Sequence, residues 1–116
     1  TEQAAKEAGL SYVVSRFPFN ANGRALTLGD ADGQVRMICA ANGSGAAEGG
    51  KVLGVHILGP RAGDLIGEAA LAMRLGASAR DIAGTIHAHP TLPEALREAA
   101  LAQLDGALHY DQRGER

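Results

Sequence analysis

Aromatic residues and cysteine are scarce in this chain of 116 residues. It contains two phenylalanines, two tyrosines, no tryptophan and a single cysteine. With so few large rings, we expect a core of Ala, Leu, Val and Ile side chains, and the 16 glycines favour turns and close backbone contacts. Because Cys39 is alone, an internal disulfide bond is excluded and a reducing cytoplasm is the expected compartment.

An excess of charge of either sign is also missing. The formal net charge is −2, and acidic and basic residues are interspersed. The lack of a basic stripe argues against a nucleic-acid partner. No apolar run approaches the roughly 20 residues that span a bilayer, and no signal peptide opens the chain, so no membrane association is expected. The length suits one domain over residues 1–116.

Three segments have the pattern of β-strands: residues 10–17, 34–40 and 51–58. Pro18 predicts that the first strand ends at a sheet edge or a bend. The glycine-rich residues 41–50 begin with Asn-Gly, which predicts an antiparallel pair joined by a long, mobile connection. Residues 51–58 are apolar on nearly both faces, which predicts a central strand.

The remaining segments have helical patterns. Residues 2–8 are good helix formers that end at Gly9, and Asn20 or Asn22 is expected to cap a short turn over residues 23–26.

After residue 60 the apolar period changes from two to 3.6. One helix is predicted to end at Gly76, a short one over residues 79–83 follows Ser78 as its cap, and a last one runs from Pro93 as far as Leu108. Because the strands precede the helices, the predicted fold class is α+β, an antiparallel β-sheet covered on one side by helices. The helix that is predicted to end at Gly76 carries an apolar stripe, which consists of Leu65, Ile66, Ala69, Ala70 and Met73.

The stretch that could carry chemistry surrounds His89 and Pro90. Glu94 follows five residues after the histidine, at the start of the last helix. A carboxylate that accepts from one imidazole nitrogen fixes the tautomer and leaves the other nitrogen available as a base. Glu94 and Thr91 also match the S/T-x-x-E pattern of a capping box, a purely structural alternative. From the residues alone capping is the favoured interpretation, although Pro93 makes the box imperfect.

The other histidines give weaker indications of a functional site. His87 and His89 form an H-x-H pair that could bind a metal with His56 or Glu94, but a fourth ligand at suitable spacing is not evident, so no metal site is expected. His56 and His109 are interpreted as ordinary core or surface histidines.

Two patterns imitate functional motifs. Residues 43–48, G-S-G-A-A-E, nearly match G-x-G-x-x-G, but the last glycine is replaced and the segment joins two strands, so dinucleotide binding is not expected. Cys39 lies within a predicted strand without a neighbouring cysteine, which predicts an inert, buried thiol.

Residues 89–95, H-P-T-L-P-E-A, resemble the H-P-T-L-S-E-A motif of dihydrolipoamide dehydrogenases, which are pyridine nucleotide–disulfide oxidoreductases. Residues 17–25, 53–66 and 81–83 are similar to further segments of the same family, in the same order. The resemblance covers roughly residues 9–104. It identifies the chain as a C-terminal dimerisation domain of that family.

The resemblance implies a role in an FAD-containing homodimer that oxidises protein-bound dihydrolipoamide and passes the electrons to NAD. In such an enzyme His89 would deprotonate a dihydrolipoamide thiol in the partner subunit's active site, and Glu94 would orient and polarise His89. The backbone of His89 and Pro90 would contact the partner's FAD, and their peptide bond would be cis. The enzyme's partners would be the lipoyl-bearing subunits of a 2-oxoacid dehydrogenase-type complex.

The sequence departs from the family in ways that limit the expectation. Pro93 replaces the usual serine, and the flavin fingerprint, the redox cysteine pair and the nicotinamide domain are missing from these residues. The chain alone is therefore expected to bind neither cofactor and to be inactive. A freestanding self-association module, or the same domain from a glutathione- or mercuric-type reductase, are the alternatives. Thr91 and Leu92, with no C-terminal cysteine pair, favour lipoamide.

Overall fold

The computed structural model describes residues 1–41 and 49–111. The expected mobile connection between the strands and the G-x-G-x-x-E stretch fall largely outside these residues, as do residues 113–116. In chain order the elements are α1 (Glu2–Glu7), β1 (Tyr12–Pro18), the 3-10 helix η1 (Phe19–Ala21), α2 (Gly23–Leu28), β2 (Gln34–Ala40), β3 (Val52–Leu58), α3 (Ala62–Leu75), α4 (Ala79–Gly84) and α5 (Glu94–Leu101).

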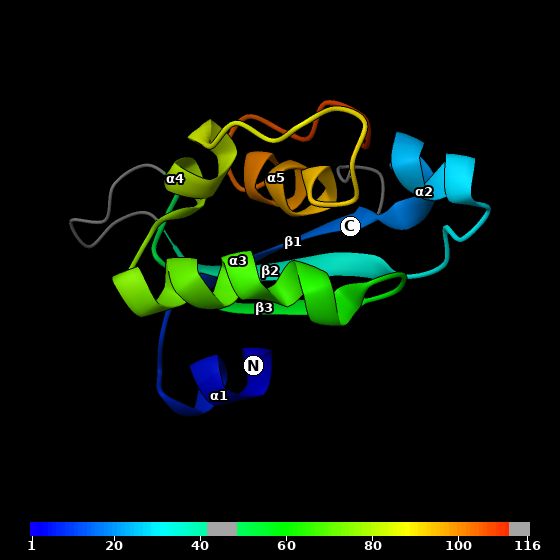
Figure 1. The fold of residues 1–116 in the computed structure, drawn as a ribbon. Helices are drawn as coiled ribbons and strands as arrows, with labels where there is room; N and C mark the ends of the chain where they lie inside the picture. The colour runs from blue at the N-terminus through cyan, green and yellow to red at the C-terminus, as the bar shows by residue number, and fades with distance from the viewer. Residues whose placement is uncertain (42–48, 112–116) are drawn as a thin grey trace.

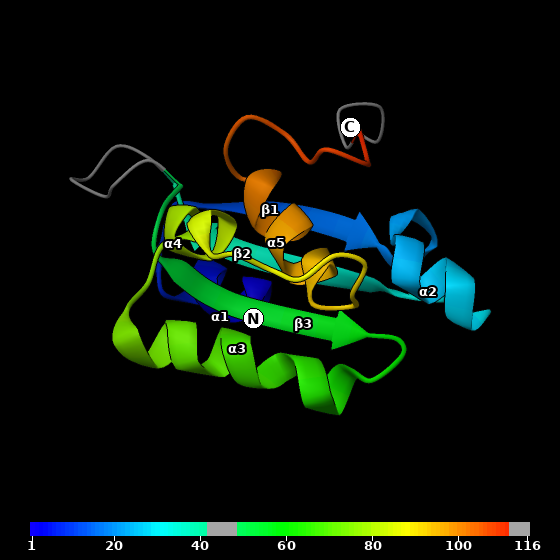
Figure 2. The same ribbon diagram turned by 45° about the horizontal axis from the view of Figure 1, so that its top comes forward.

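The three strands form an antiparallel sheet in the order β1-β2-β3. Val35 lies between Phe17 on β1 and Ile57 on β3, and these three residues face the core. The α+β class is confirmed. The predicted central position of the third strand is wrong, because β2 is the central strand. The second neighbour of β3 is helix α3, which packs along it (Figure 2).

Helices α4 and α5 lie on one side of the sheet, and the short α1 lies on the other (Figure 1). Helix α5 packs against β1 and β2. Its buried residues include three alanines with no exposed surface, and such short side chains permit a close helix–sheet approach. The residues at the centre of the core are Phe17, Phe19, Val35, Met37, Cys39, Ala95, Leu96, Ala99 and Ala100.

Local capping residues determine several helix ends. Asn22 caps α2 by accepting from the Ala25 N–H, and Gly76 ends α3 in the left-handed conformation at φ 69°. Ser78 caps α4 in a reciprocal capping box with Asp81. These three caps agree with the sequence-based expectation.

The last helix is shorter than predicted. Helix α5 ends at Leu101, not near Leu108. The chain turns away because Gly106, at φ 114°, donates its N–H to the carbonyl oxygen of Leu101. A φ of this sign suits glycine and ends the helical pattern even though apolar residues continue beyond it.

Within residues 1–41 and 49–111, every helix falls short of the length and apolar character needed to traverse a bilayer.

Cys39 is buried in β2 with 1 % of its surface exposed, and burial raises the pKa of its thiol to about 12. We expect iodoacetamide at pH 8 to leave Cys39 unmodified in the folded protein and to alkylate it in denaturant, because the thiolate is the reactive form. Mass spectrometry of the two samples measures this difference. Rapid alkylation without denaturant would contradict the described burial.

Candidate functional site

The candidate site is the turn between α4 and α5, residues 85–93. Its His89–Pro90 peptide bond is cis, as the resemblance implies. Leu92 points into the core and is 8 % exposed, which fixes the turn from beneath. Arg97 on α5 donates from Nε to the carbonyl oxygen of Ala83 at 3.1 Å, so the two helices that flank the turn are held together.

His89 and Glu94 are hydrogen-bonded to each other. The Nδ1 atom of His89 lies 2.9 Å from Oε1 of Glu94 and 3.2 Å from Oε2. Glu94 is the first residue of α5, where the positive end of the helix dipole favours a carboxylate. The histidine side chain is 74 % exposed and the glutamate side chain 24 %. The pair is thus supported from the protein side and open on the solvent side.

One of the two hydrogen bonds of a capping box between Thr91 and Glu94 is present. Oε2 of Glu94 accepts from the backbone N–H of Thr91 at 2.8 Å. The reciprocal bond is not made by the hydroxyl of Thr91, which donates to the carbonyl oxygen of Ala88 at 2.6 Å, and the N-cap position belongs to Pro93. One carboxylate therefore holds both the backbone of the turn and the imidazole. The two interpretations of the motif coexist.

The charge state of Glu94 follows from these contacts. Partial burial acts to raise the pKa of Glu94, but the hydrogen bonds from Thr91 and His89 and the electrostatic attraction of the His89 and His109 side chains outweigh it. The pKa of Glu94 consequently lies below its ordinary value. An ionised Glu94 accepts hydrogen bonds only, so Nδ1 of His89 carries a proton.

The second ring nitrogen of His89 is available. Among the described residues, Nε2 has no hydrogen-bond partner, and in the neutral tautomer with a proton on Nδ1 it carries a lone pair. Such a nitrogen can accept a proton from a group brought to it, and the Glu94 carboxylate would then stabilise the imidazolium. The arrangement has the form of a general base with an orienting acid.

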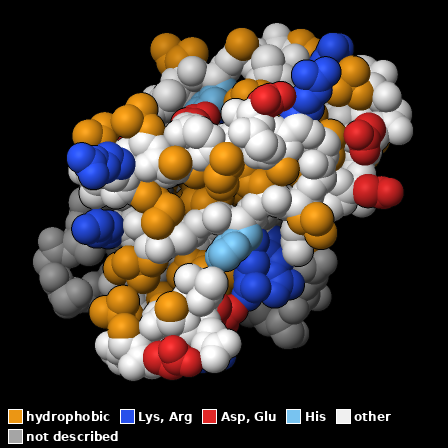
Figure 3. All heavy atoms as spheres, turned by 60° about the horizontal axis from the view of Figure 1, so that its bottom comes forward, with side chains coloured by type: hydrophobic (Ala, Val, Ile, Leu, Met, Phe, Trp, Pro, Cys, Tyr) orange, Lys and Arg blue, Asp and Glu red, His pale blue; other side chains and the backbone are white. Residues whose placement is uncertain are grey.

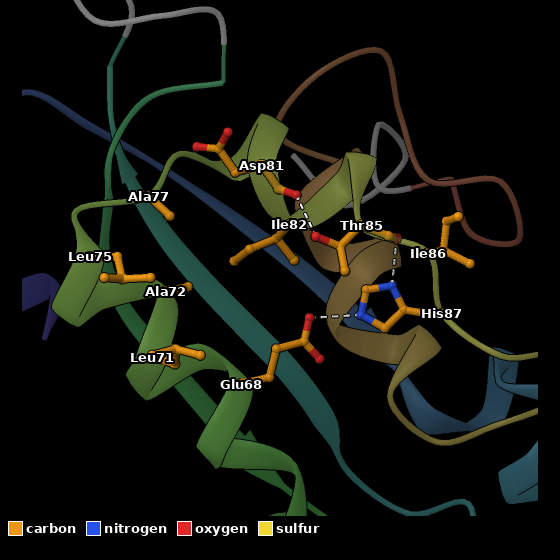
Figure 4. A pocket seen from close by; sticks show the side chains of 10 residues that line it. All are labelled: Glu68, Leu71, Ala72, Leu75, Ala77, Asp81, Ile82, Thr85, Ile86 and His87. Carbon is orange, nitrogen blue, oxygen red and sulfur yellow. Dashed lines mark hydrogen bonds and ion pairs between the residues drawn. The ribbon is translucent and has the colours of Figure 1, made fainter.

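His87 lies in a different environment from His89. Its side chain is 5 % exposed, with Nε2 2.7 Å from Oε1 of Glu68 and Nδ1 2.9 Å from the carbonyl oxygen of Thr85. Both ring nitrogens therefore face oxygen acceptors. Figure 4 shows His87 turned toward Glu68 at one end of a groove of about 330 Å³ between α3 and α4.

The histidines do not converge. His87 pairs with Glu68, His89 pairs with Glu94, and His56 is exposed on β3. In the described part of the chain, no three His, Cys, Asp or Glu side chains lie close enough to hold a metal ion.

Besides His87 with Glu68, the sequence analysis did not predict the pairing of His109 with Glu98. His109 contacts Glu98 through Nδ1 at 2.7 Å, and Glu98 also accepts from the backbone N–H groups of Leu108 and His109. Glu98 is one turn after Glu94 on α5 and is buried. A buried glutamate within an apolar helix face was the one available hint, because a buried charge needs partners.

The chain matches a protein-family model described as pyridine nucleotide-disulphide oxidoreductase, dimerisation domain, over residues 1–100. It is 52 % identical over 111 residues to the mitochondrial dihydrolipoyl dehydrogenase of Schizosaccharomyces pombe, covering 95 % of this chain and 20 % of that protein. It is 49 % identical over 109 residues to the dihydrolipoyl dehydrogenase of Thermus scotoductus, covering 94 % and 22 %. The chain thus spans about a fifth of the length of these relatives.

Solved structures show the same fold at lower identity. LpdA from Mycobacterium tuberculosis matches with a TM-score of 0.76 and 22 % identity, over 89 % of this chain and 21 % of that one. The HOCl-induced flavoprotein disulfide reductase RclA from Escherichia coli matches with a TM-score of 0.76 and 24 % identity, over 87 % and 22 %. At these identities the likeness supports the fold.

The lowered pKa of Glu94 makes stability depend on pH. A carboxylate whose pKa falls on folding stabilises the protein above its ordinary pKa of 4.5 and loses this contribution as the pH falls through the folded-state value. We expect Glu94→Gln to reduce the free energy of unfolding at pH 7, with the deficit shrinking below about pH 4.5. Urea unfolding of both proteins at several pH values measures it. A deficit that stayed constant down to pH 3 would contradict the assignment.

Proposed function

Because the chain belongs to the pyridine nucleotide-disulphide oxidoreductase dimerisation domain family, we propose that it is the dimerisation domain of a dihydrolipoamide dehydrogenase and supplies His89 and Glu94 to a partner subunit's active site. The observation that carries the proposal is the hydrogen bond between an exposed imidazole and a carboxylate at a helix start. Identities near 50 % to several dihydrolipoyl dehydrogenases support the choice of substrate class.

In this proposal His89 is the base that starts thiol oxidation. Nε2 of His89 takes the proton of a dihydrolipoamide thiol, and the resulting thiolate becomes the nucleophile. Glu94 holds the ring through Nδ1 and stabilises the positive charge that the ring acquires. The exposure of the ring supports this role, because a thiol carried by another molecule must reach Nε2.

The redox chemistry belongs to groups outside these residues. In the complete enzyme, bound FAD would supply the redox chemistry, the transfer of the two electrons of the dithiol to NAD. His89 and Pro90 are both exposed, which suits the proposed contact of their backbone with an FAD held by the partner subunit. The lipoyl-bearing subunits of a 2-oxoacid dehydrogenase-type complex are the proposed partners of that enzyme.

The proposed homodimer contact includes exposed apolar residues of α3. Leu65, Ala69 and Ala72 face the core, whereas other large apolar residues of the helix remain exposed, and Leu71 and Leu75 among them line the groove between α3 and α4. Figure 3, seen from the side of α1, shows hydrophobic side chains gathered in several groups on that side of the molecule. Extended apolar surface of this kind is typical of a protein–protein contact. The exposed set on and after α3 comprises Ile66 at 36 %, Leu71 at 60 %, Met73 at 39 %, Leu75 at 75 % and Ile86 at 96 %.

We expect the double substitution Leu71→Glu with Leu75→Glu to weaken self-association at least tenfold, because two charges would be buried in an apolar contact. Sedimentation across a concentration series measures the dimer dissociation constant. Leu108→Glu, which changes an equally exposed leucine on the C-terminal segment, is the matched control and should leave the constant unchanged. Equal effects of the two changes would argue against α3 as the contact face.

We expect His89→Gln in the full-length enzyme to reduce dihydrolipoamide oxidation by about 10²–10⁴-fold, since the general base is lost. Steady-state kinetics measures the rate, and the visible absorption of bound FAD verifies an intact flavin site. His56→Gln, at an exposed histidine on β3, is the control that should keep the activity. Unchanged turnover in His89→Gln would exclude His89 as the base.

A further inference from the structure

Asn22 is a buried amide whose two ends serve different segments. The residue is 4 % exposed. Its Oδ1 accepts from the N–H of Ala25 at 3.0 Å and caps α2, while its Nδ2 donates to the carbonyl oxygen of Thr91 at 3.1 Å, 69 residues further along the chain. Because both ends are engaged, the amide cannot rotate without breaking a buried hydrogen bond. Its contact with the turn is therefore fixed in direction.

The Thr91 contact continues to the imidazole. The carbonyl oxygen of Thr91 is held by Asn22, and its N–H donates to Oε2 of Glu94 at 2.8 Å. The other oxygen of Glu94 lies 2.9 Å from Nδ1 of His89. A connected series of hydrogen bonds thus runs from the start of α2, through one residue of the turn, to the ring of His89.

We propose that Asn22 is a positioning residue for His89. It contacts neither substrate nor cofactor and acts by setting the place and orientation of Thr91, which in turn directs the Glu94 carboxylate toward Nδ1. This inference rests on the proposed function, since positioning has a catalytic effect only if His89 is the base. A displacement of a base by a fraction of an ångström is costly when the proton must pass between two aligned atoms.

The chemistry at this position requires an amide. Aspartate would keep the cap on α2 but would turn a second acceptor toward the Thr91 carbonyl oxygen. Serine would also keep the cap, but its side chain is shorter by one heavy-atom bond and carries no group that reaches Thr91. Both substitutions therefore remove the donor and leave the N-cap acceptor in place, and serine does so without adding charge.

The test compares Asn22→Asp and Asn22→Ser with the unchanged full-length enzyme. We expect both to lower kcat for dihydrolipoamide oxidation about tenfold with little change in KM, less than the 10²–10⁴-fold loss of the base itself. Hydrogen exchange of the peptide that contains Thr91 should quicken, because the Thr91 carbonyl oxygen loses its donor and the Thr91 N–H is then held less firmly against Glu94. In a Glu94→Gln background, Asn22→Ser should cause no further loss of kcat, since both act through one contact.

Ser78→Ala is the matched control. It removes the side-chain cap of α4, a helix of the same length as α2, without touching Thr91. It should leave both kcat and the exchange of the Thr91 peptide unchanged. If Asn22→Asp fails to fold, Asn22→Ser carries the comparison by itself.

Two results would overturn the inference: wild-type kcat and exchange in the Asn22 variants, or a loss of kcat that adds in full to that of Glu94→Gln. Failure of the proposed function can be distinguished from failure of this inference. In that case His89→Gln would retain turnover, whatever the exchange of the Thr91 peptide shows.

Discussion

The carboxylate of Glu94 accepts from the Thr91 N–H and from the His89 ring at the same time, and the geometry of the candidate site follows from this double contact. A flexible side chain alone would not hold an exposed imidazole in one orientation. Here one oxygen is committed to the backbone, which restricts where the other oxygen can lie. The helix start favours the negative charge, and the hydrogen bonds offset the partial burial that opposes it.

The position of Glu94 depends in turn on how α5 packs on the sheet. Ala95, Ala99 and Ala100 have no exposed surface, so the helix backbone comes close to β1 and β2. The hydroxyl of Ser15 on β1 donates to the carbonyl oxygen of Ala99 at 2.6 Å, and Gln103 donates to Ser15. These polar contacts fix the position of α5 along β1. A site that needs accuracy is therefore built on the most closely packed part of the domain.

The groove between α3 and α4 extends to the segment that precedes His89, because Ile86 and His87 line it together with Leu71 and Leu75 of α3. His87, two residues before His89, is buried against Glu68 of α3 and against the carbonyl oxygen of Thr85. The chain between α4 and α5 is therefore fastened to α3 as well as to α2. A partner bound at the exposed apolar residues of α3 would also meet the segment that carries His89, as the proposed supply of His89 to a partner subunit requires.

Several features could be predicted from the sequence because they depend on contacts a few residues apart. Ser78 and Asp81 form their capping box within one turn, Gly76 ends α3 by its own backbone freedom, and Asn22 caps the next residues. The His89–Glu94 spacing, at five residues, belongs to the same class. The resemblance of residues 89–95 to a known motif added the proposed chemistry, which local spacing could not supply.

The tertiary structure decided the rest, because the deciding contacts join residues far apart in the chain. The central place of β2 arose because α3, not a fourth strand, covers β3. His87 with Glu68, His109 with Glu98, and Asn22 with Thr91 are separated by 19, 11 and 69 residues. A single sequence records which groups need partners but not which distant partner the packing brings to them. The local pattern thus determined the helices, strands and caps, and the packing of α5 and α3 on the sheet decided what each buried polar group contacts.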